Sequence, residues 1–264
     1  RHNLQLNWPK VEDVPEILAE LAEVEMHAIQ TSGNCLRNIT TDQFAGVAAD
    51  EVIDPRPLAE ILRQWTTFHP EFAFLPRKFK IAISGTKDDR AVTWFHDIGL
   101  QLQEQNGETG FRVIVGGGLG RTPIRGQVVR EFLPWQHILT YCEAILRVYN
   151  RQGRRDNAYK ARIKILVQAL GVEAFAQLVE DEWAHGKDGP ATISQAEFDR
   201  VAAHFTAPAY ETLSASDAGL SEKLALEKSF KNWVDRSTHP HKVPGYTAVT
   251  LSLKRAGLPP GDVT

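Results

Sequence analysis

The sequence predicts a protein of mixed secondary structure, in which helices precede and follow an antiparallel sheet. Apolar residues recur at helical spacing before residue 70 and after Pro134, whereas the spacing between Lys78 and Val115 is two, as in strands. Of the 264 residues, 42% are hydrophobic, which is ordinary for a globular protein and excludes collagen-like and disordered chains. No apolar run approaches the roughly 18 residues that a membrane span requires.

The N-terminal part predicts one short strand and two helices. Alternation over residues 3–8 is typical of the end of a half-buried strand. Asp13 is the expected N-cap of the first helix, because Pro15 falls in its first turn and an apolar stripe follows. Asp54-Pro55 starts the second helix, which ends near Pro70, and residues 31–38 are small and polar without a period and predict a loop.

The middle of the chain predicts three strands of the antiparallel sheet. These are residues 79–83, 92–103 and 110–115, separated by a polar turn over 84–90 and by Asn106-Gly107. The C-terminal part predicts helices over 134–151, 156–170, 172–185 and 194–204, the last with Ser194 as N-cap and Glu197 three residues on. Residues 205–240 show a weak pattern, and 246–253 alternate as a final strand.

Charge and cysteine content restrict the function classes. A net charge of −3, without aromatic residues interleaved among basic ones, disfavours nucleic-acid binding. Cys35 and Cys142 are too few for a disulfide scaffold or for the roughly four ligands of a zinc or iron–sulfur site. Low cysteine usage predicts a cytoplasmic protein. Because the chain begins at Arg1 and its only methionine is Met26, we expect it to begin after the natural start.

Two motifs indicate binding of an anion or a flat ligand, each with a simpler alternative. Lys78 and Lys80 lie on one face of a strand, so they either bind an anion between them or protect an exposed strand edge. The glycines over 116–120 lack Rossmann spacing, because the third glycine would fall on Arg121. They either let a flat ligand lie against the backbone or form a tight turn.

A basic segment and a basic loop residue extend this pattern. Between Arg147 and Lys164, seven basic residues accompany one acidic residue, Asp156, which indicates either a solvated surface or a clamp for phosphate or a polycarboxylate cofactor. Arg37 either joins an anion clamp or caps a helix.

These segments together resemble the sirohaem-dependent sulfite and nitrite reductases of the assimilatory hemoprotein type. The resemblance rests on the order and spacing of six motifs: RHNLQLN (1–7), GNCLRN (33–38), FLPRKFK (74–80), VGGGL (115–119), EFLP (131–134) and RRDNAYK (154–160). Residues 243–253 are similar to the opening strand of the second, pseudo-symmetric half of that family.

The resemblance implies an α+β fold, with antiparallel sheet and packed helices flanked by partial ferredoxin-like half-domains. Residues 1–33 would end the first half-domain, 34–235 would form the sirohaem and substrate domain, and 236–264 would form a linker and the first strand of the second half-domain. Arg37, Lys78 and Lys80 match the catalytic cations that bind sulfite or nitrite over sirohaem. The implied sirohaem contacts are Arg1, Gln5, Asn7, Arg77, Gly116, Gly117, Gly118, Arg154, Arg155 and Lys160.

The implied activity is the six-electron reduction of sulfite to sulfide or of nitrite to ammonia, with ferredoxin or a flavoprotein as donor. The family also carries a [4Fe–4S] cluster on four cysteines, and neither Cys35 nor Cys142 has their spacing. We therefore expect the N-terminal half of a reductase, without metal ligands of its own. The alternative is a non-catalytic module that binds an anion or a tetrapyrrole. Neither nucleic acid nor a membrane is expected as a partner.

Overall fold

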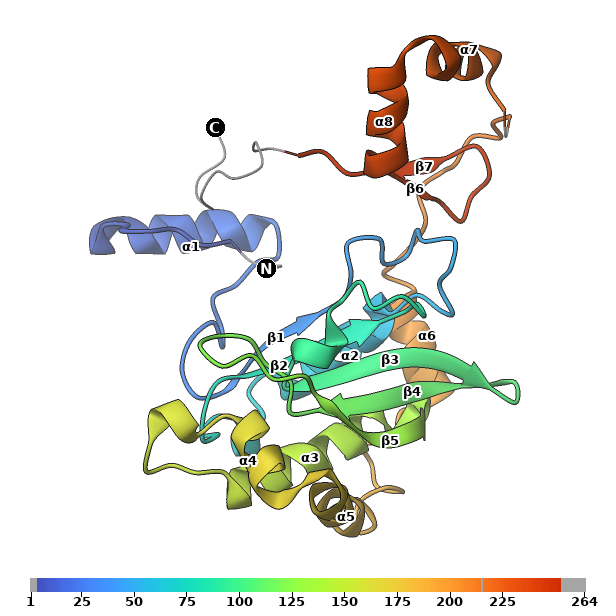
Figure 1. Ribbon diagram of the computed structural model, residues 1–264. Coiled ribbons are helices and arrows are strands. Elements are labelled where there is room, and N and C mark those ends of the chain that lie inside the picture. The colour runs from blue at the N-terminus through green and yellow to red at the C-terminus, as the bar shows by residue number, and fades with distance from the viewer. Residues whose placement is uncertain (1–3, 215, 253–264) are drawn as a thin grey trace. The chain divides into compact units, whose positions relative to one another are not determined.

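The computed structural model describes residues 4–214 and 216–252, and it divides into two compact units. The first unit comprises residues 1–43 and 52–205, and the second comprises 44–51 and 206–264. Figure 1 shows the elements of both.

A five-stranded mixed sheet forms the centre of the first unit. Its strands are β1 (Leu36–Thr40), β2 (Phe79–Ser84), β3 (Ile98–Gln105), β4 (Glu108–Val115) and β5 (Gln127–Pro134), in that spatial order. The pair β3–β4 is antiparallel, as the sequence predicts, and β4–β5 is antiparallel too, but β1–β2 and β2–β3 are parallel. The antiparallel prediction is therefore wrong for half of the sheet. The reason is that two crossovers return the chain to the same end of the sheet, one through α2 (Arg56–Thr66) between β1 and β2 and one through residues 85–97 between β2 and β3.

The strand boundaries also differ from the predicted ones. β1 occupies part of the predicted loop over 31–38, and β5 was not predicted, because neither segment alternates regularly. The strand predicted over 92–103 begins only at Ile98. Val92 has a positive φ of 58°, and Thr93–Phe95 form a 3₁₀ helix, η3, which ends before the strand starts.

One face of the sheet forms the core of the first unit with the helices. Ile81, Ile83, Ile98, Leu100 and Val113 are fully buried there. The helices are α2 together with α3 (Ile138–Gln152), α4 (Ile163–Leu170), α5 (Val172–Trp183) and α6 (Gln195–Ala202). In Figure 1, α3, α4 and α5 lie along the lower side of the sheet, and α2 and α6 lie behind it. The mixed α+β fold class is thus confirmed.

The predicted helices agree with these elements except at their N-terminal ends. α3 follows a 3₁₀ turn, η4 (Trp135–His137), and α4 begins at Ile163 because Ala158–Lys160 form another, η5. Ser194 is the N-cap of α6, as predicted, and its Oγ accepts the Glu197 N–H at 3.2 Å. A further 3₁₀ turn, η2 (Pro70–Phe72), follows α2.

The N-terminal segment departs further from prediction. α1 (Val14–Glu23) forms, but Asp13 belongs to the preceding 3₁₀ turn, η1 (Val11–Asp13), and makes no side-chain cap. Residues 4–8 form no strand, and Asn3 lies outside the described residues. The Trp8 side chain is 98% exposed, so the alternation in this segment does not reflect burial against a sheet.

The second unit contains a helical pair and a short hairpin. α7 (Ala218–Leu226) and α8 (Lys228–Ser237) occupy a segment in which the sequence pattern predicted little. β6 (Thr238–Pro240) pairs antiparallel with β7 (Thr247–Val249), and Ala48 bridges to His241. The strand predicted over 246–253 is thus shorter, and residue 253 is not among the described residues.

The Ser194 cap gives a direct test of how α6 is stabilised. Ser194→Ala removes the acceptor for the Glu197 N–H, and we expect the free energy of unfolding to fall by about 1 kcal/mol. Ser194→Asp keeps an acceptor and should lose much less. Chemical denaturation of the three proteins measures both effects. Equal losses in the two variants would contradict a capping role.

Candidate functional site

The pairing of β1 with β2 brings Arg37 beside Lys78 and Lys80. Leu36 pairs with Phe79 and Asn38 with Lys80, so β1 has one more residue than β2 over this step, and Arg37 is that extra residue. Phe79 is fully buried in the core. Because side chains alternate along a strand, Lys78 and Lys80 lie on the opposite face, with Cα atoms about 6–7 Å apart.

The charges of this cluster act on one another. Partial burial lowers the pKa of Lys78, and the charges of Arg37, Arg162, Lys80 and Arg77 lower it further, in that order. Each neighbouring cation disfavours a further positive charge on the Lys78 amine. We call Arg37, Arg77, Lys78, Lys80 and Arg162 the cation cluster. The structure therefore brings all three predicted catalytic residues together with Arg77.

Arg37 is held at the edge of the cluster by its own loop. Its Nε and Nη2 donate to the Gly33 carbonyl oxygen at 3.0 and 2.9 Å. These two bonds fix the plane of the guanidinium where β1 begins. The role of a helix cap, which the sequence left open for Arg37, is wrong, because Arg37 lies inside a strand.

A buried carboxylate, Asp97, lies next to the cluster. Its side chain is 0% exposed, its Oδ2 accepts the backbone N–H of Lys80 at 3.0 Å, and its Oδ1 accepts from Arg162 Nε and Nη2 at 3.0 and 2.7 Å. Burial raises the pKa of the Asp97 carboxyl, whereas Arg162 and the Lys80 N–H favour the ionised form. Sequence reasoning missed both Asp97 and Arg162. The only signal was that Arg162 belongs to the basic segment.

The predicted glycine motif lies against the same residues. Gly116 has a φ of +82° and donates its N–H to the Asp97 carbonyl oxygen at 3.0 Å. A Cβ on Gly117 would lie 2.4 Å from the Trp94 carbonyl oxygen, so no side chain fits there. Both positions require glycine for the turn and for close backbone packing.

Gly118 is the glycine nearest to the cations. A Cβ there would lie 3.2 Å from Lys164 Cδ and 3.6 Å from Arg162 Nη2. Lys164 in turn donates from Nζ to the Thr122 carbonyl oxygen at 2.6 Å, which holds the loop after the glycines. Burial, followed by the charge of Arg162, lowers the pKa of Lys164.

The predicted contacts in the basic segment lie on the surface. Arg154 is exposed and donates to Asp156 at 3.0 and 2.5 Å. Arg155 bonds to the side chain and carbonyl of Asn150, and Lys160 is exposed in η5. The Arg155 charge does act on the buried Tyr149 hydroxyl, as do those of Asp97 and Arg162.

The predicted N-terminal contacts, Arg1, Gln5 and Asn7, lie in the first residues of the chain. Arg1 lies outside the described residues, and Gln5 and Asn7 are exposed in a segment without helix or strand. Their role as cofactor contacts stays a prediction.

The described residues do not fit an iron–sulfur cluster. Burial raises the pKa of the Cys142 thiol in α3 to about 12, and burial also raises the pKa of Cys35, whose Sγ lies 3.2 Å from the Ser32 carbonyl oxygen. Both shifts oppose the thiolate form that ligates iron. Across residues 4–214 and 216–252, no three His, Cys, Asp or Glu side chains form a group that could hold a metal ion. Over the same residues, no helix is long and apolar enough to cross a membrane.

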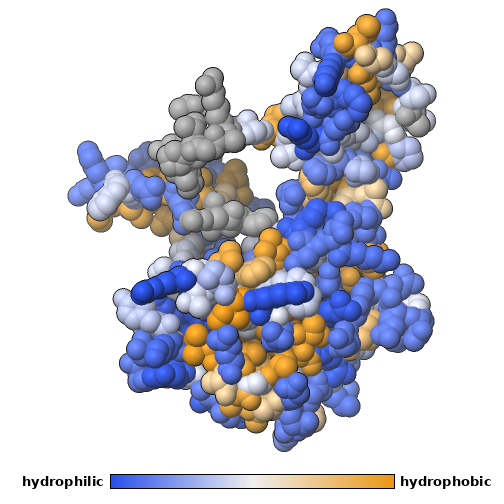
Figure 2. Space-filling view, viewed as in Figure 1, coloured by the Kyte–Doolittle hydropathy of each residue, from blue (hydrophilic) through white to orange (hydrophobic). Residues whose placement is uncertain are grey.

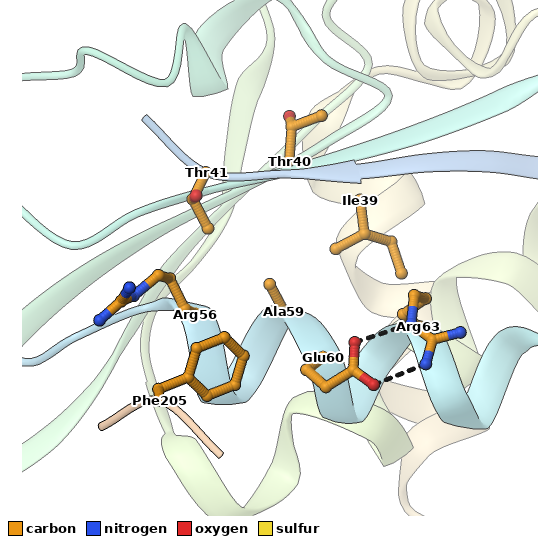
Figure 3. A pocket seen from close by; sticks show the side chains of 8 residues that line it. All are labelled: Ile39, Thr40, Thr41, Arg56, Ala59, Glu60, Arg63 and Phe205. Atoms are coloured by element: carbon orange, nitrogen blue, oxygen red, sulfur yellow. Dashed lines mark hydrogen bonds and ion pairs between the residues drawn. The ribbon is translucent and has the colours of Figure 1, made fainter. Parts of the chain in front are cut away.

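A small cavity lies elsewhere in the first unit, between β1 and α2 (Figure 3). It has a volume of about 190 Å³, and its basic side chains are already neutralised: Arg63 pairs with Glu60 at 2.6 Å and Arg56 with Asp54 at 2.7 Å. The Lys78 and Lys80 ammonium groups, by contrast, lie among other cations. The cation cluster is therefore the better candidate for binding an anion.

The sequence matches the family described as nitrite and sulphite reductase 4Fe-4S domain over residues 32–187. That range extends from β1 to α5 and includes the whole cation cluster. The chain belongs to this family. Two curated relatives illustrate its range: sulfite reductase [ferredoxin] 1 of Mycolicibacterium paratuberculosis is 36% identical over 194 residues, and ferredoxin–nitrite reductase of Leptolyngbya laminosa is 34% identical over 190.

These matches cover most of this chain and a minor part of each relative. They include 72% and 70% of the chain but 35% and 37% of the respective relatives, so the chain spans about a third of their length. Among solved structures, the NirA protein of Mycobacterium tuberculosis matches with a TM-score of 0.61 and 33% identity, over 68% of this chain and 33% of NirA. Members of both the sulfite and the nitrite class are thus similar to this reductase-family domain.

Mutual repulsion in the cation cluster predicts a charge-dependent shift at one amine. Arg37→Gln removes a charge that lowers the Lys78 pKa, so we expect that pKa to rise toward the usual lysine range. Titration of ¹³C-dimethylated lysines by NMR measures it. Arg200→Gln on α6 is the control and should leave the Lys78 titration unchanged. A Lys78 pKa that ignores Arg37→Gln would show that the two charges do not interact.

Proposed function

We propose that this chain is the sirohaem- and substrate-binding part of a ferredoxin-dependent sulfite or nitrite reductase. The observation that carries the proposal is the grouping of Arg37, Lys78 and Lys80 within the segment that matches the reductase family. Clustered cations bind a small oxyanion and stabilise the charge that develops as its oxygens leave.

Residues in and beside the cation cluster would suit a tetrapyrrole rich in carboxylates. Arg77 and Lys164 supply positive charge, and at Gly118 only a hydrogen points toward the side chains of Lys164 and Arg162. Large apolar side chains are exposed in the same segments, as a flat macrocycle would require: Phe74 is 80% and Leu119 is 62% exposed. Figure 2 shows such mixing, with hydrophobic side chains gathered on the visible face of the first unit and hydrophilic ones between them.

We place the [4Fe–4S] cluster of the intact enzyme outside this chain. The relatives are about three times as long as the segment they share with it, and both thiols here are buried with raised pKa values. The chain would then be the N-terminal half that its motifs resemble, with partial ferredoxin-like half-domains over 1–33 and 236–264. The intact protein would act in the cytoplasm.

The cation cluster would bind the substrate and deliver protons to it. Sirohaem, when bound, supplies the electrons. Lys78 and Lys80 would hold the oxygens of the anion through their ammonium groups, with Arg37 fixed beside them by Gly33. Each oxygen that leaves as water takes up two protons. The lowered pKa of Lys78 makes its ammonium group a better proton donor than an ordinary lysine, because partial burial and then the neighbouring charges favour its neutral form.

The choice between sulfite and nitrite stays open at this site. Both are small oxyanions that the same cations would hold, and the relatives include both kinds of reductase. Ferredoxin is the proposed donor because the names of both relatives specify it. A flavoprotein is the alternative donor.

A second candidate function is a non-catalytic module that binds a tetrapyrrole or an anion. The matched segment covers only about a third of the relative's length, and this favours the non-catalytic function for the chain on its own. Retention of a haem-type absorbance band without turnover, in a protein that also carries the cluster, would identify this function.

Substituting the lysines tests the catalytic proposal. In the cofactor-loaded protein that contains this chain, Lys78→Met or Lys80→Met should lower turnover by about 10²-fold, because each removes a cation and a proton source. The haem-type absorbance should be largely retained. Lys187→Met, at an exposed position distant from the cluster in sequence, is the control. Full turnover in both lysine variants would refute the assignment.

Substituting Gly118 tests the proposed cofactor contact. The side chain of Gly118→Val would extend toward Lys164 and Arg162 and occupy the space assigned to the cofactor. The chain reconstituted with sirohaem should then lose most of its haem-type band, as measured by absorbance. Gly186→Val is the control, because nothing lies within 4 Å of a Cβ there. An unchanged band in Gly118→Val, or no band in the unmodified chain, would rule out this contact.

A further inference from the structure

Asp97 connects two segments of the cation cluster and the glycine turn through separate atoms. Oδ2 accepts the Lys80 N–H, Oδ1 accepts two bonds from Arg162, and the backbone carbonyl accepts the Gly116 N–H. One residue therefore joins β2, the residue before α4 and the glycine turn.

The sheet explains why a side chain is needed at this point. The β2–β3 ladder begins where Ile81 pairs with Ile98, so Lys80 and Asp97 both lie just before it. The Lys80 N–H would have no partner on β3, and the Asp97 carboxylate accepts it instead at 3.0 Å. This fixes the start of β2 at the position that carries the Lys80 side chain.

The same carboxylate limits where Arg162 can lie. A carboxylate with 0% exposure is stable only when its charge is compensated, and the Arg162 fork on Oδ1 provides that charge. Arg162 is itself only 19% exposed, so its guanidinium has little freedom. It lies close enough to Lys78 for its charge to act on that amine.

We propose that Asp97 is the positioning residue of the cation cluster: its buried carboxylate holds the β2 backbone at Lys80 and the guanidinium of Arg162 at a fixed separation. The anion then meets cations that are already in place. This inference rests on the proposed function, because Asp97 would act through the lysines that bind the anion. Fixed geometry matters because a misplacement of about 1 Å can cost about 10²-fold in rate.

A matched control exists in the same unit. Asp42 is also a carboxylate with 0% side-chain exposure beside an arginine, because its Oδ1 lies 3.6 Å from Arg90 Nε. Asp97→Asn and Asp42→Asn each remove one buried negative charge. Both variants should unfold at a lower temperature, so stability alone does not test the positioning role.

The experiment compares these variants in the cofactor-loaded protein that contains this chain. Asp97→Asn should lower kcat/KM for sulfite or nitrite by about 10²-fold, mainly by raising KM, whereas Asp42→Asn should stay near the unmodified value. In the unloaded protein, NMR of dimethylated Lys78 and Lys80 should show a weaker response to added sulfite in Asp97→Asn only.

Arg162→Lys keeps the charge but cannot form the guanidinium fork, and it replaces Asp97→Asn if that variant does not fold. It should raise KM while the haem-type band is retained, and an unchanged KM would overturn the inference. Equal kcat/KM in Asp97→Asn and Asp42→Asn would also overturn it. If Lys78→Met and Lys80→Met lose turnover while Asp97→Asn does not, only the positioning inference fails. If the lysine variants keep full turnover, the proposed function fails, and the inference fails with it.

Discussion

The buried carboxylate of Asp97 is the constraint on which the arrangement of the candidate site depends. A charge with 0% exposure is tolerated only where hydrogen bonds and an opposite charge compensate its lost hydration. Asp97 obtains them from the Lys80 N–H and from Arg162, which are 82 residues apart in the chain. The hydrogen bonds of the Asp97 carboxylate therefore fix the position of the start of β2 relative to the N-terminal end of α4.

Repulsion within the cation cluster destabilises the folded first unit, and the burial of apolar side chains in the core of that unit compensates for this cost. The positive charges of the cluster repel one another, and this repulsion adds to partial burial in lowering the pKa of Lys78. On the other face of β2, Phe79, Ile81 and Ile83 are fully buried, and each contributes about 1.5–3 kcal/mol relative to an exposed side chain. The apolar face of the strand thus holds the charged face in a position that it would not adopt alone. Local conflict of this kind is expected at a functional site.

Sequence patterns predicted the cations better than they predicted the arrangement around them. Lys78 and Lys80 follow from alternation, because Phe79 between them is a core residue. The parallel pairing of β1 with β2 was not predictable from alternation, which is the same for both strand directions. Arg162 lies in a basic segment whose other members are largely paired on the surface, and its contact with Asp97 depends on tertiary structure alone. The glycine motif could be read as a turn or as a ligand contact. Gly116 and Gly117 are explained by the turn and by backbone packing, whereas Gly118 is the glycine that we propose as a ligand contact.

Membership of the nitrite and sulphite reductase family and the clustered charges of Arg37, Lys78 and Lys80 support the function that we propose, the binding of an oxyanion among fixed cations. The most direct measurement is a crystal structure of the cofactor-loaded protein that contains this chain, with sulfite or nitrite bound. We expect the anion within hydrogen-bond distance of Lys78 and Lys80, with the Asp97 carboxylate still hydrogen-bonded to Arg162 and to the Lys80 N–H. An anion bound away from both lysines would contradict it.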